Sequence, residues 1–548
     1  MIIAIAQLNY KIGDLDYNFS KIITAIEKAI NENAELIIFS ELAITGYSPL
    51  DLLYNESFVN QAIAKINDLS KHCKNITAII GGPSISKKLK GKSLLNSAWV
   101  VNNQGAKVVA SKTFLTTYGA INEYRHFQPN DEFNVINING KRLAITIGED
   151  LWDDKQTDNW KEKNQYNHIS PIQKLAALKP NYIVNIAALP FAYDKIEERN
   201  DLISNKAKNY STPIIYINQV GGNAQFIYDG SSKIVIDNGE TTHQLSPFEE
   251  EVRIITNIET TDKVTASDVI SLIHKALILG IQDFFKKAGF KKAVLGLSGG
   301  LDSALVAALV AEAIGAENVH GILMPSVYST DHSITDAVDL AKNLNISYDI
   351  IPIKELFNSF NTSLADIFSD KPANVTEENI QARIRGTILM AYSNKFGHIL
   401  LNTSNKSEAA VGYGTLYGDM NGSLSVIGDL YKSRAFELSR YINRDKEIIP
   451  INTITKPPSA ELSPNQQDSD SLPDYDILDA ILFNHIEKGK SAEELISEGH
   501  NSEIVKRALS LLNSSDFKRY QSPPVLHISS NPLRSSREIS LIGKVSFS

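Results

Sequence analysis

The sequence predicts an α/β protein with two large domains. Short apolar runs of strand length recur through the first half of the 548-residue chain, with helical patterns between several of them. Strands interspersed with helices are typical of layered α/β folds. The second half starts again with a helix and continues as strand, helix, strand, helix, strand, which predicts a doubly wound parallel sheet. Over residues 240–263 the pattern weakens into charged and polar residues, so we predict the junction there and domains at 1–250 and 251–548.

Apolar spacing predicts the individual elements. In the first half, helical spacing covers residues 19–30 and 58–69, and residues 459–473 of the second half are rich in Ser, Pro, Gln and Asp, which predicts a loop. The predicted strands of the first half are 2–6, 36–39, 78–80, 98–101, 143–147, 182–186 and 214–217. The second half is predicted as helix 267–288, strand 292–297, helix 304–314, strand 319–324, helix 334–344 and strand 348–353.

Charge and hydropathy exclude several classes of protein. The formal charge of −9 argues against a general nucleic-acid binder, which would carry a basic surplus. The most apolar helical stretch, 304–316, is interrupted by Glu312 and is too short to span a bilayer. The N-terminus lacks the basic start and long apolar segment of a signal peptide. The single cysteine, Cys73, excludes an internal disulfide and a thiolate zinc site. We expect a cytoplasmic protein that binds neither membrane nor nucleic acid.

A glycine-rich loop between a predicted strand and a predicted helix is the strongest local signal. It reads Leu-Ser-Gly-Gly-Leu-Asp-Ser over residues 297–303. Its two glycines let the backbone approach an anion closely, and the amides at the helix N-terminus then face that anion. The acidic Asp302 would repel phosphate unless a metal lies between them, and Mg²⁺ held by a carboxylate and phosphate oxygens meets that need. The loop therefore predicts phosphate binding.

This loop resembles the pyrophosphate loop of the N-type ATP pyrophosphatases. Further strings, in matching order and spacing, resemble the glutamine-dependent NAD synthetase family over nearly the whole chain; they are residues 378–385, 402–408, 412–419, 458–462 and 518–521. The resemblance implies a C-terminal doubly wound sheet of the adenine nucleotide alpha hydrolase type. It also implies an N-terminal nitrilase-like α-β-β-α sandwich and a homo-oligomer.

The resemblance implies a reaction and the residues for it. ATP would adenylate the carboxylate of deamido-NAD with release of pyrophosphate, and ammonia would then displace AMP to give NAD. Two lysines, Lys406 and Lys432, would neutralise phosphate charge. The implied ATP-binding residues are Gly296, Leu297, Ser298, Gly299, Gly300, Leu301, Asp302, Ser303 and Thr403; deamido-NAD would contact Asn379, Glu408 and Lys518, and Mg²⁺ would be bound by Asp302 and Glu408.

The first half resembles the nitrilase superfamily, which serves in this family as a glutaminase. Such a site needs a carboxylate base, a lysine and a cysteine nucleophile. Glu41 matches the base and Lys112 the lysine, while Tyr118 and Lys195 match the glutamine pocket. The nucleophile position is Gly148, in Gly-Glu-Asp-Leu-Trp, where relatives have Cys-Glu-Asp-x-Trp. Glycine has no side chain with which to attack an amide.

Other departures from the family accompany the missing cysteine. Leu189 stands where relatives have a serine that contacts glutamine, and Ala224-Gln225 replaces an Asp-Glu pair. Cys73 lies in an apolar-periodic segment, which predicts a core role. Loss of the nucleophile in a serine protease costs about 10⁶-fold in turnover. We therefore expect this chain to use ammonia and not glutamine.

Three alternatives stay open at this point. The chain could be a glutamine-hydrolysing synthetase with an unusual or residual glutaminase. It could be another ligase built on the same loop, such as a nucleotide aminase or an asparagine-forming enzyme. It could also be a catalytically decayed nucleotide-binding homologue. One departure in the second half is Ser404, where relatives commonly have glycine.

Overall fold

Two compact units make up the computed structural model of the chain. The first unit comprises Met1–Asn223 and Ile227–Ser267, and the second comprises Ala224–Phe226 and the chain from Asp268 onward. The structure describes residues 1–88, 90–117, 121–152, 170–262, 268–369, 371–459, 461–464, 466–470 and 472–533.

The first unit contains two six-stranded sheets. In one of them, β1, β2 and β3 run parallel, while β14 pairs antiparallel with β1 at one edge. That pairing carries the first unit past residue 250, where the predicted ranges meet. The strand order is β14 (Glu251–Ile255), β1 (Ile3–Gln7), β2 (Leu36–Ile38), β3 (Thr77–Ile85), β4 (Leu94–Asn102) and β5 (Gly105–Ser111).

The other sheet is mixed in the same way. Strands β7, β8 and β9 run parallel, and antiparallel strands flank them on both sides. A two-stranded ribbon, β10 (Val220–Asn223) with β11 (Phe226–Asp229), follows β9 along the chain. The strand order is β13 (Thr241–Gln244), β12 (Lys233–Val235), β9 (Ile214–Asn218), β8 (Tyr182–Ala187), β7 (Lys141–Ile147) and β6 (Val135–Ile138).

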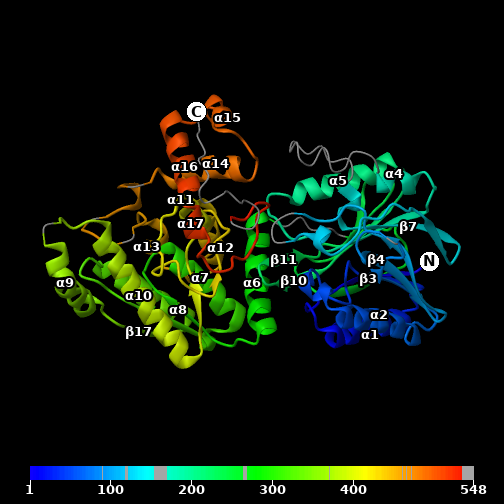
Figure 1. Cartoon of the computed structure of the whole chain (residues 1–548), viewed down its shortest axis with the longest axis horizontal. Coiled ribbons are helices and arrows are strands. Elements are labelled where there is room, and N and C mark those ends of the chain that lie inside the picture. The colour runs from blue at the N-terminus through cyan, green and yellow to red at the C-terminus, as the bar shows by residue number, and fades with distance from the viewer. Residues whose placement is uncertain are drawn as a thin grey trace. The chain divides into compact units, whose positions relative to one another are not determined.

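The two sheets pack face to face, with helices outside them. An apolar core between the sheets joins side chains such as Ile5 and Ile38 of one sheet to Val184 and Ile215 of the other. Figure 1 shows α1 and α2 along one side of this sandwich and α4 and α5 along the other. This confirms the predicted α-β-β-α sandwich. The helices are α1 (Leu15–Asn31), α2 (Glu56–Asp68), α4 (Pro171–Ala176) and α5 (Ile196–Asn209), with single turns η1 (Leu50–Tyr54), η2 (Leu69–Lys71), η3 (Glu123–Arg125) and η4 (Gly148–Trp152).

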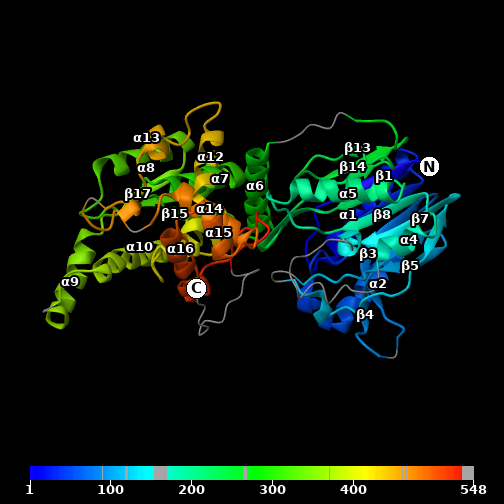
Figure 2. The ribbon, with the colours of Figure 1, turned by 90° about the horizontal axis from the view of Figure 1, so that it is seen from above.

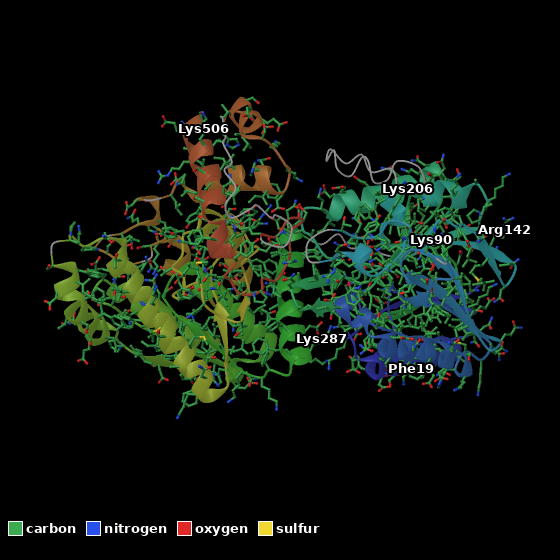
Figure 3. All side chains as sticks on the ribbon, viewed as in Figure 1. Phe19, Lys90, Arg142, Lys206, Lys287 and Lys506 are labelled. Carbon is green, nitrogen blue, oxygen red and sulfur yellow. The ribbon has the colours of Figure 1, made fainter. Side chains whose placement is uncertain are left out.

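Helix α1 illustrates why these elements form. Asp14 caps it by accepting a hydrogen bond of 3.1 Å from the Tyr17 amide. Ile22, Ile26 and Ala29 lie one helical turn apart and are all buried against the sheet. Apolar residues at this spacing form the stripe that an amphipathic helix buries. Figure 3 shows side chains filling the space between helix and sheet, whereas the labelled Arg142 projects from the surface.

The second unit is built around a five-stranded parallel sheet. Its central strands are apolar and buried on both faces, as parallel strands covered by helices must be. This confirms the predicted doubly wound sheet. The strand order is β17 (Ser347–Ile350), β16 (Val319–Leu323), β15 (Ala293–Gly296), β18 (Ile399–Asn402) and β19 (Leu424–Ser425).

Helices surround this sheet. Helix α7 is apolar on nearly every side because α6, α8 and α12 as well as strands pack against it. Figures 1 and 2 agree in placing α14, α15 and α16 side by side, and these helices share an apolar core. The helices are α6 (Val269–Ala288), α7 (Leu301–Ile314), α8 (Asp331–Leu344), α9 (Lys354–Phe368), α10 (Val375–Phe396), α11 (Lys406–Val411), α12 (Lys432–Ile442), α13 (Ile451–Thr455), α14 (Tyr475–Ile486), α15 (Ala492–Ser497), α16 (Ser502–Ser514) and α17 (Asp516–Arg519), with single turns η5 (Ala316–Asn318) and η6 (Asp468–Asp470).

The predicted loop at 459–473 contains, in its described residues, the single turn η6 and no longer element. Within the described part of the chain, no helix combines the length and the apolar character needed to cross a membrane.

Candidate functional sites

Glu41 and Lys112 meet in the interior of the first unit. Glu41 follows β2 and Lys112 follows β5, and their side chains are 1% and 0% exposed. The ammonium group of Lys112 lies 2.8 Å from Glu41 Oε1. The same oxygen accepts a hydrogen bond of 2.7 Å from Asn96 Nδ2, and Glu41 Oε2 accepts one of 3.2 Å from the Ala188 amide. The structure thus brings together the two predicted remnants of the glutaminase.

Lys112 is shared by three carboxylates. Besides Glu41, its ammonium group lies 2.8 Å from Glu123 Oε2 and 2.5 Å from Glu149 Oε2. Burial alone would lower the pKa of Lys112, but Glu123, Glu149 and Glu41 raise it well above its usual value. Burial also raises the pKa of Glu41, to about 8, against the opposing pull of Lys112. One buried cation facing three carboxylates leaves negative charge in excess, which favours retention of a proton on the cluster.

Gly148 lies directly against this pair of side chains. It directly follows β7 and begins η4 with a φ of +51°, a backbone conformation that residues other than glycine rarely adopt. A Cβ atom built on Gly148 would lie 2.8 Å from Glu41 Oε2 and 2.9 Å from Lys112 Nζ. The Gly148 carbonyl accepts a hydrogen bond of 3.1 Å from Asn185 Nδ2. Glu41 and Lys112 therefore occupy the space that a side chain at position 148 would need.

The other predicted residues of this unit lie elsewhere or outside the description. Tyr118 is not among the described residues. Lys195 precedes α5 and pairs with Glu198 at 2.7 Å. Cys73 is confirmed as a core residue: it is 0% exposed within the apolar cluster under the first sheet, and burial raises the pKa of its thiol to about 12. A thiol held in this form is a poor nucleophile.

The glycine-rich loop of the second unit joins β15 to α7, as predicted. Ser298 Oγ and Ser303 Oγ lie 3.0 Å apart across the loop, and the Gly300 amide donates to Ser298 Oγ at 3.1 Å. Gly299 has a φ of +77°, and a Cβ there would lie 2.2 Å from the Ser333 carbonyl oxygen. Glycine is therefore required at 299 by both backbone angle and space. The loop leads into the N-terminus of a fourteen-residue helix, an end that favours anions.

A cavity of about 740 Å³ opens in front of this loop. Nearly all predicted ATP-binding residues line it, and Glu408 and Lys432 line it as well. A smaller cavity of about 40 Å³ shares Ser404, Glu408 and Tyr413 with the large one, so the two meet at these residues. The predicted residues that line the large cavity are Gly296, Leu297, Ser298, Gly300, Leu301, Asp302, Ser303, Thr403 and Glu408.

Two carboxylates and a lysine meet at the wall of the large cavity. Lys432 forms an ion pair with Asp302, and its ammonium group lies 3.6 Å from Glu408 Oε1. Asn405 Nδ2 lies 3.2 Å from Asp302 Oδ1, to which it donates. Burial and the nearby charge of Asp302 raise the pKa of Glu408 well above its usual value. Negative charge is thus concentrated here, at a place where a cation would relieve it.

The described residues contain no cluster of three or more Asp, Glu, His or Cys side chains that could hold a metal by themselves. This does not count against Mg²⁺ at the large cavity, because Mg²⁺ in nucleotide sites is held by one or two carboxylates together with phosphate oxygens and water. Asp302 and Glu408 are two carboxylates that line one cavity with the glycine-rich loop. This donor set fits a Mg²⁺ that arrives with the triphosphate.

Asn379 and Lys518 converge on a different feature, the loop that follows α11. Asn379 Oδ1 accepts a hydrogen bond of 2.7 Å from Thr415 Oγ1. Lys518 Nζ donates to the carbonyl oxygens of Gly412 and Gly414, both at 2.8 Å. The two residues therefore brace one short loop from α10 and α17. Glu408, predicted for the same substrate, belongs to α11, which ends directly before that loop.

The sequence-based role for Lys406 is wrong. Lys406 is 0% exposed, and its ammonium group pairs with Asp429 at 2.8 Å and with Glu487. It also donates to Ser529 Oγ at 2.7 Å. The charge of a buried lysine that pairs with two carboxylates is already neutralised and does not face a phosphate. Lys406 therefore fixes the start of α11 to the interior of the unit. Lys432, the other lysine expected to neutralise phosphate, does line the cavity.

Sequence reasoning assigned no role to two residues at this site. Asp468 lines the cavity and accepts hydrogen bonds from the hydroxyls of Tyr413 at 3.2 Å and Tyr475 at 2.9 Å. No signal marked Asp468, because it lies in the polar loop after α13. Asn405 could have been found, because Asn followed three residues later by Glu408 is the pattern of a helix capping box.

Comparisons with known proteins match both units. Residues 273–522 match the family model described as NAD synthase, and residues 2–153 match the model described as carbon-nitrogen hydrolase. The chain superposes on a solved glutamine-dependent NAD(+) synthetase from Cytophaga hutchinsonii with a TM-score of 0.82, over 99% of this chain and 98% of the other. The two sequences are 23% identical, so this match supports the fold alone.

More similar proteins match over nearly the full length. The chain is 43% identical to the glutamine-dependent NAD(+) synthetase of Synechocystis, covering 96% of each protein, and 36% identical to that of Acinetobacter baylyi, covering 98% of each. It superposes on a solved glutamine-dependent NAD(+) synthetase from Acinetobacter baumannii in complex with ADP with a TM-score of 0.76, at 32% identity, over 100% of this chain and 99% of the other. The chain therefore belongs to the glutamine-dependent NAD(+) synthetase family.

Proposed function

We propose that this protein is an NAD synthetase that converts deamido-NAD and ATP into NAD, AMP and pyrophosphate, with ammonia as its nitrogen source. The observation that carries the synthetase activity is the cavity of about 740 Å³, which the glycine-rich loop shares with Asp302, Glu408 and Lys432. Loop amides, a helix N-terminus and two carboxylates with a lysine are the groups expected where a nucleotide triphosphate reacts.

The chemistry follows from the charges of the substrates. A carboxylate oxygen of the nicotinate ring attacks the α-phosphorus of ATP, and the bond from that phosphorus to the β,γ-pyrophosphate breaks. The amides of residues 297–303 and the N-terminus of α7 offset negative charge as pyrophosphate departs. Mg²⁺, held by Asp302 and Glu408 with phosphate oxygens, would supply further charge neutralisation there.

The second step forms the amide. The lone pair of ammonia attacks the acyl carbon of the adenylate, AMP leaves with the electrons of the acyl–oxygen bond, and one proton is released. The small cavity of about 40 Å³ meets the large one at Ser404, Glu408 and Tyr413. A space of that size can hold a molecule as small as water or ammonia. This supports a route by which a small nucleophile reaches the acyl carbon.

The roles of individual residues are part of this proposal. Residues 296–303 and Thr403 bind ATP, and Glu408 contacts deamido-NAD. Asn379 and Lys518 also contact deamido-NAD, a role for which the support is indirect: both hold the 412–415 loop that continues from α11. Lys432, paired with Asp302, would exchange that partner for phosphate when ATP binds.

Ammonia is proposed as the nitrogen source because of Gly148. In nitrilase-like glutaminases the residue between the carboxylate and the lysine is the nucleophile, and here it is a glycine whose side-chain space Glu41 and Lys112 already fill. Lys195 pairs with Glu198, and Leu189 presents an apolar side chain. We infer that the first unit has lost glutamine hydrolysis and retains a structural or regulatory role.

Two further expectations belong to the proposal. A homo-oligomer is supported by the apolar side chains of Leu356, Phe360 and Ile367 on α9, which are 46%, 48% and 74% exposed in the single chain. A cytoplasmic location suits a chain with one buried cysteine, since cytoplasmic proteins rarely rely on disulfides.

The test is to supply the purified full-length protein with deamido-NAD, ATP and Mg²⁺, and with either ammonium or glutamine as the nitrogen source. We expect NAD and one pyrophosphate per NAD with ammonium, and less than about 1% of that rate with glutamine. A comparable rate with glutamine would favour the residual-glutaminase alternative. Absence of pyrophosphate release under either condition would favour a decayed nucleotide-binding protein. Xanthosine monophosphate and aspartate serve as control acceptors for the rival ligases.

A further inference from the structure

Asn405 contacts both of the residues, Asp302 and Glu408, whose carboxylates line the large cavity. It is 0% exposed and is the N-cap residue of α11. Its side-chain oxygen Oδ1 accepts a hydrogen bond of 2.9 Å from the backbone amide of Glu408, and the backbone amide of Asn405 donates to Glu408 Oε2 at 3.3 Å. Its Nδ2 donates to Asp302 Oδ1 at 3.2 Å. The Asn405 side chain thus joins the Asp302 carboxylate, at the start of α7, to the backbone of Glu408 in the first turn of α11, while the Asn405 backbone amide holds the Glu408 carboxylate.

This double contact explains the residue type. Ser, Thr, Asp and Asn all cap helices well, because each offers an oxygen to the amides of the first turn. A residue that caps α11 and also donates to a carboxylate beyond the helix needs an acceptor and a donor on one planar group. Among these four residues, Asn alone has that arrangement, since ionised Asp has no donor and Ser is shorter. Capping alone would not require Asn.

The position of Asn405 is itself held firmly. The next residue, Lys406, donates its backbone amide to the Leu430 carbonyl at 2.9 Å, and its side chain pairs with Asp429 and Glu487 in the interior. The start of α11 is therefore fixed from behind, and the Asn405 side chain has little freedom to move. A rigid support of this kind lets one hydrogen bond determine where a neighbouring carboxylate points.

We propose that Asn405 is a positioning residue that fixes the Asp302 carboxylate relative to the start of α11, and hence to the Glu408 carboxylate, so that the two carboxylates together would hold the cation that accompanies ATP. The inference rests on the proposed function, because it concerns the same cavity. Asn405 touches neither substrate nor reacting atoms; it acts through Asp302 and Glu408. Without the Asn405 contact, Asp302 and Glu408 would be joined through Lys432, which in the proposed reaction exchanges Asp302 for phosphate when ATP binds.

The variants that test this keep the helix cap and remove the contact with Asp302. Asn405→Ser and Asn405→Asp both cap α11, but neither donates to Asp302, and Asn405→Asp adds a repelling charge. We expect both to weaken binding of Mg·ATP, measured by titration calorimetry, and to lower kcat for NAD formation by about 10–100-fold. For Asn405→Ser, binding of ATP in the presence of EDTA should stay at the level of the unmodified protein, because the contact of Asn405 with Asp302 affects binding of the cation and not of ATP alone.

Asn374 supplies a matched control. It caps α10 through the same Asn-x-x-Glu capping box, with Glu377 as the partner, but it lies at the surface. Asn374→Ser and Asn374→Asp should leave Mg·ATP affinity and kcat unchanged. Asn405→Ala, which loses both the cap and the contact with Asp302, should show the same loss in Mg·ATP binding as Asn405→Ser together with a lower melting temperature.

The outcomes separate the inference from the function on which it rests. If Asn405→Ser and Asn405→Asp bind Mg·ATP and turn over as the unmodified protein does, while Asn405→Ala loses stability alone, Asn405 is a helix cap and the inference is overturned. If the unmodified protein forms no NAD and releases no pyrophosphate, the proposed function fails, and the inference fails with it. A loss in Mg·ATP binding that disappears in EDTA, seen at Asn405 and absent at Asn374, supports it.

Discussion

Each of the two units buries a lysine between carboxylates, yet the two lysines differ in what lies beside them. In the first unit, Lys112 is shared by Glu41, Glu123 and Glu149, and the space of a side chain at Gly148 is already taken by Glu41 and Lys112. In the second unit, Lys432 lies between Asp302 and Glu408, and all three line a cavity of about 740 Å³. The charged groups of the two clusters are alike. In the first unit Glu41 and Lys112 pack closely against Gly148, whereas in the second unit the charged groups face the cavity.

Raised pKa values of buried glutamates are common to both clusters and do not by themselves identify a reactive site. In both units burial raises the pKa of a glutamate, Glu41 in one and Glu408 in the other. Shifted pKa values of this kind are expected at active sites, but structural networks of ion pairs produce them as well. The first cluster lies beside a glycine, which offers no reactive side chain, whereas the second cluster lines a cavity of about 740 Å³. Four measurements test this contrast between the two clusters.

The largest effect is expected at Asp302. Asp302→Asn removes one of the two carboxylates that face the large cavity and should lower ammonium-dependent NAD formation by about 10²–10³-fold, the usual cost of losing one group that stabilises developing charge. Steady-state rates at saturating ATP and ammonium provide the measurement. Glu123→Gln, an isosteric change in the first unit, is the control and should leave that rate within about twofold. Equal losses in both variants would contradict the contrast between the units.

The next effect is on the stability of the first unit. Lys112→Met leaves the buried Glu41 and Glu123 and the partly exposed Glu149 without their cation, and removal of one partner from a buried ion pair costs about 3–5 kcal/mol. We expect a markedly lower midpoint for unfolding of the first unit, followed by calorimetry of the full chain. Below that midpoint, the rate of NAD formation with ammonium should be unchanged. If Lys112→Met unfolds no earlier than the unmodified protein, the cluster does not stabilise the unit.

A smaller effect is expected when a thiol is placed at position 148. Gly148→Cys introduces a side chain at a φ of +51° and within 3 Å of Glu41 and Lys112, which should cost about 1–3 kcal/mol. Glutamine-dependent NAD formation should stay below about 1% of the ammonium rate, because the lysine and glutamate fill the space in front of the thiol. Gly148→Ala is the matched control for the steric cost. A substantial rate with glutamine in Gly148→Cys would show that the glutaminase site of the first unit lacks nothing but the thiol at position 148.

The smallest effect is a pH dependence. Burial raises the pKa of Glu41 from its ordinary value of 4.5 to about 8, so the folded chain keeps a proton that the unfolded chain releases. The stability from this group is fully present below about pH 4.5 and is lost as pH rises toward 8. Glu41→Gln removes this titration. Its melting temperature, relative to that of the unmodified protein, should therefore rise between pH 5 and pH 8; a constant difference would contradict the assignment.

Local patterns allowed much of the fold to be predicted. The strand and loop at residues 292–303 combine apolar strand residues, a glycine pair and an apolar helix, and each signal lies within a few residues of the next. Helix α1 carried the same kind of local evidence. The junction was harder, because β14 lies within the polar stretch 240–263 and belongs to the first unit through its pairing with β1, almost 250 residues earlier. Such a pairing leaves no local trace.

The site was predictable in the same measure. Spacing and resemblance led to Asp302 and Glu408, which do line one cavity. They failed for Lys406, which sits in a matching string but is enclosed by Asp429 and Glu487, residues 23 and 81 positions further on. Whether a lysine faces a cavity or the interior depends on such distant partners. Asp468 was missed because the loop that carries it has no regular pattern.

The pairing of β14 with β1 has a practical consequence for separating the two units. β1 lies between β14 and β2, so a fragment that stops at residue 250 would leave a row of backbone amides and carbonyls on β1 without partners. An open strand edge of this kind recruits other chains and promotes aggregation. A fragment intended to fold by itself should extend at least through Ile255, so that the last strand closes the sheet against the first.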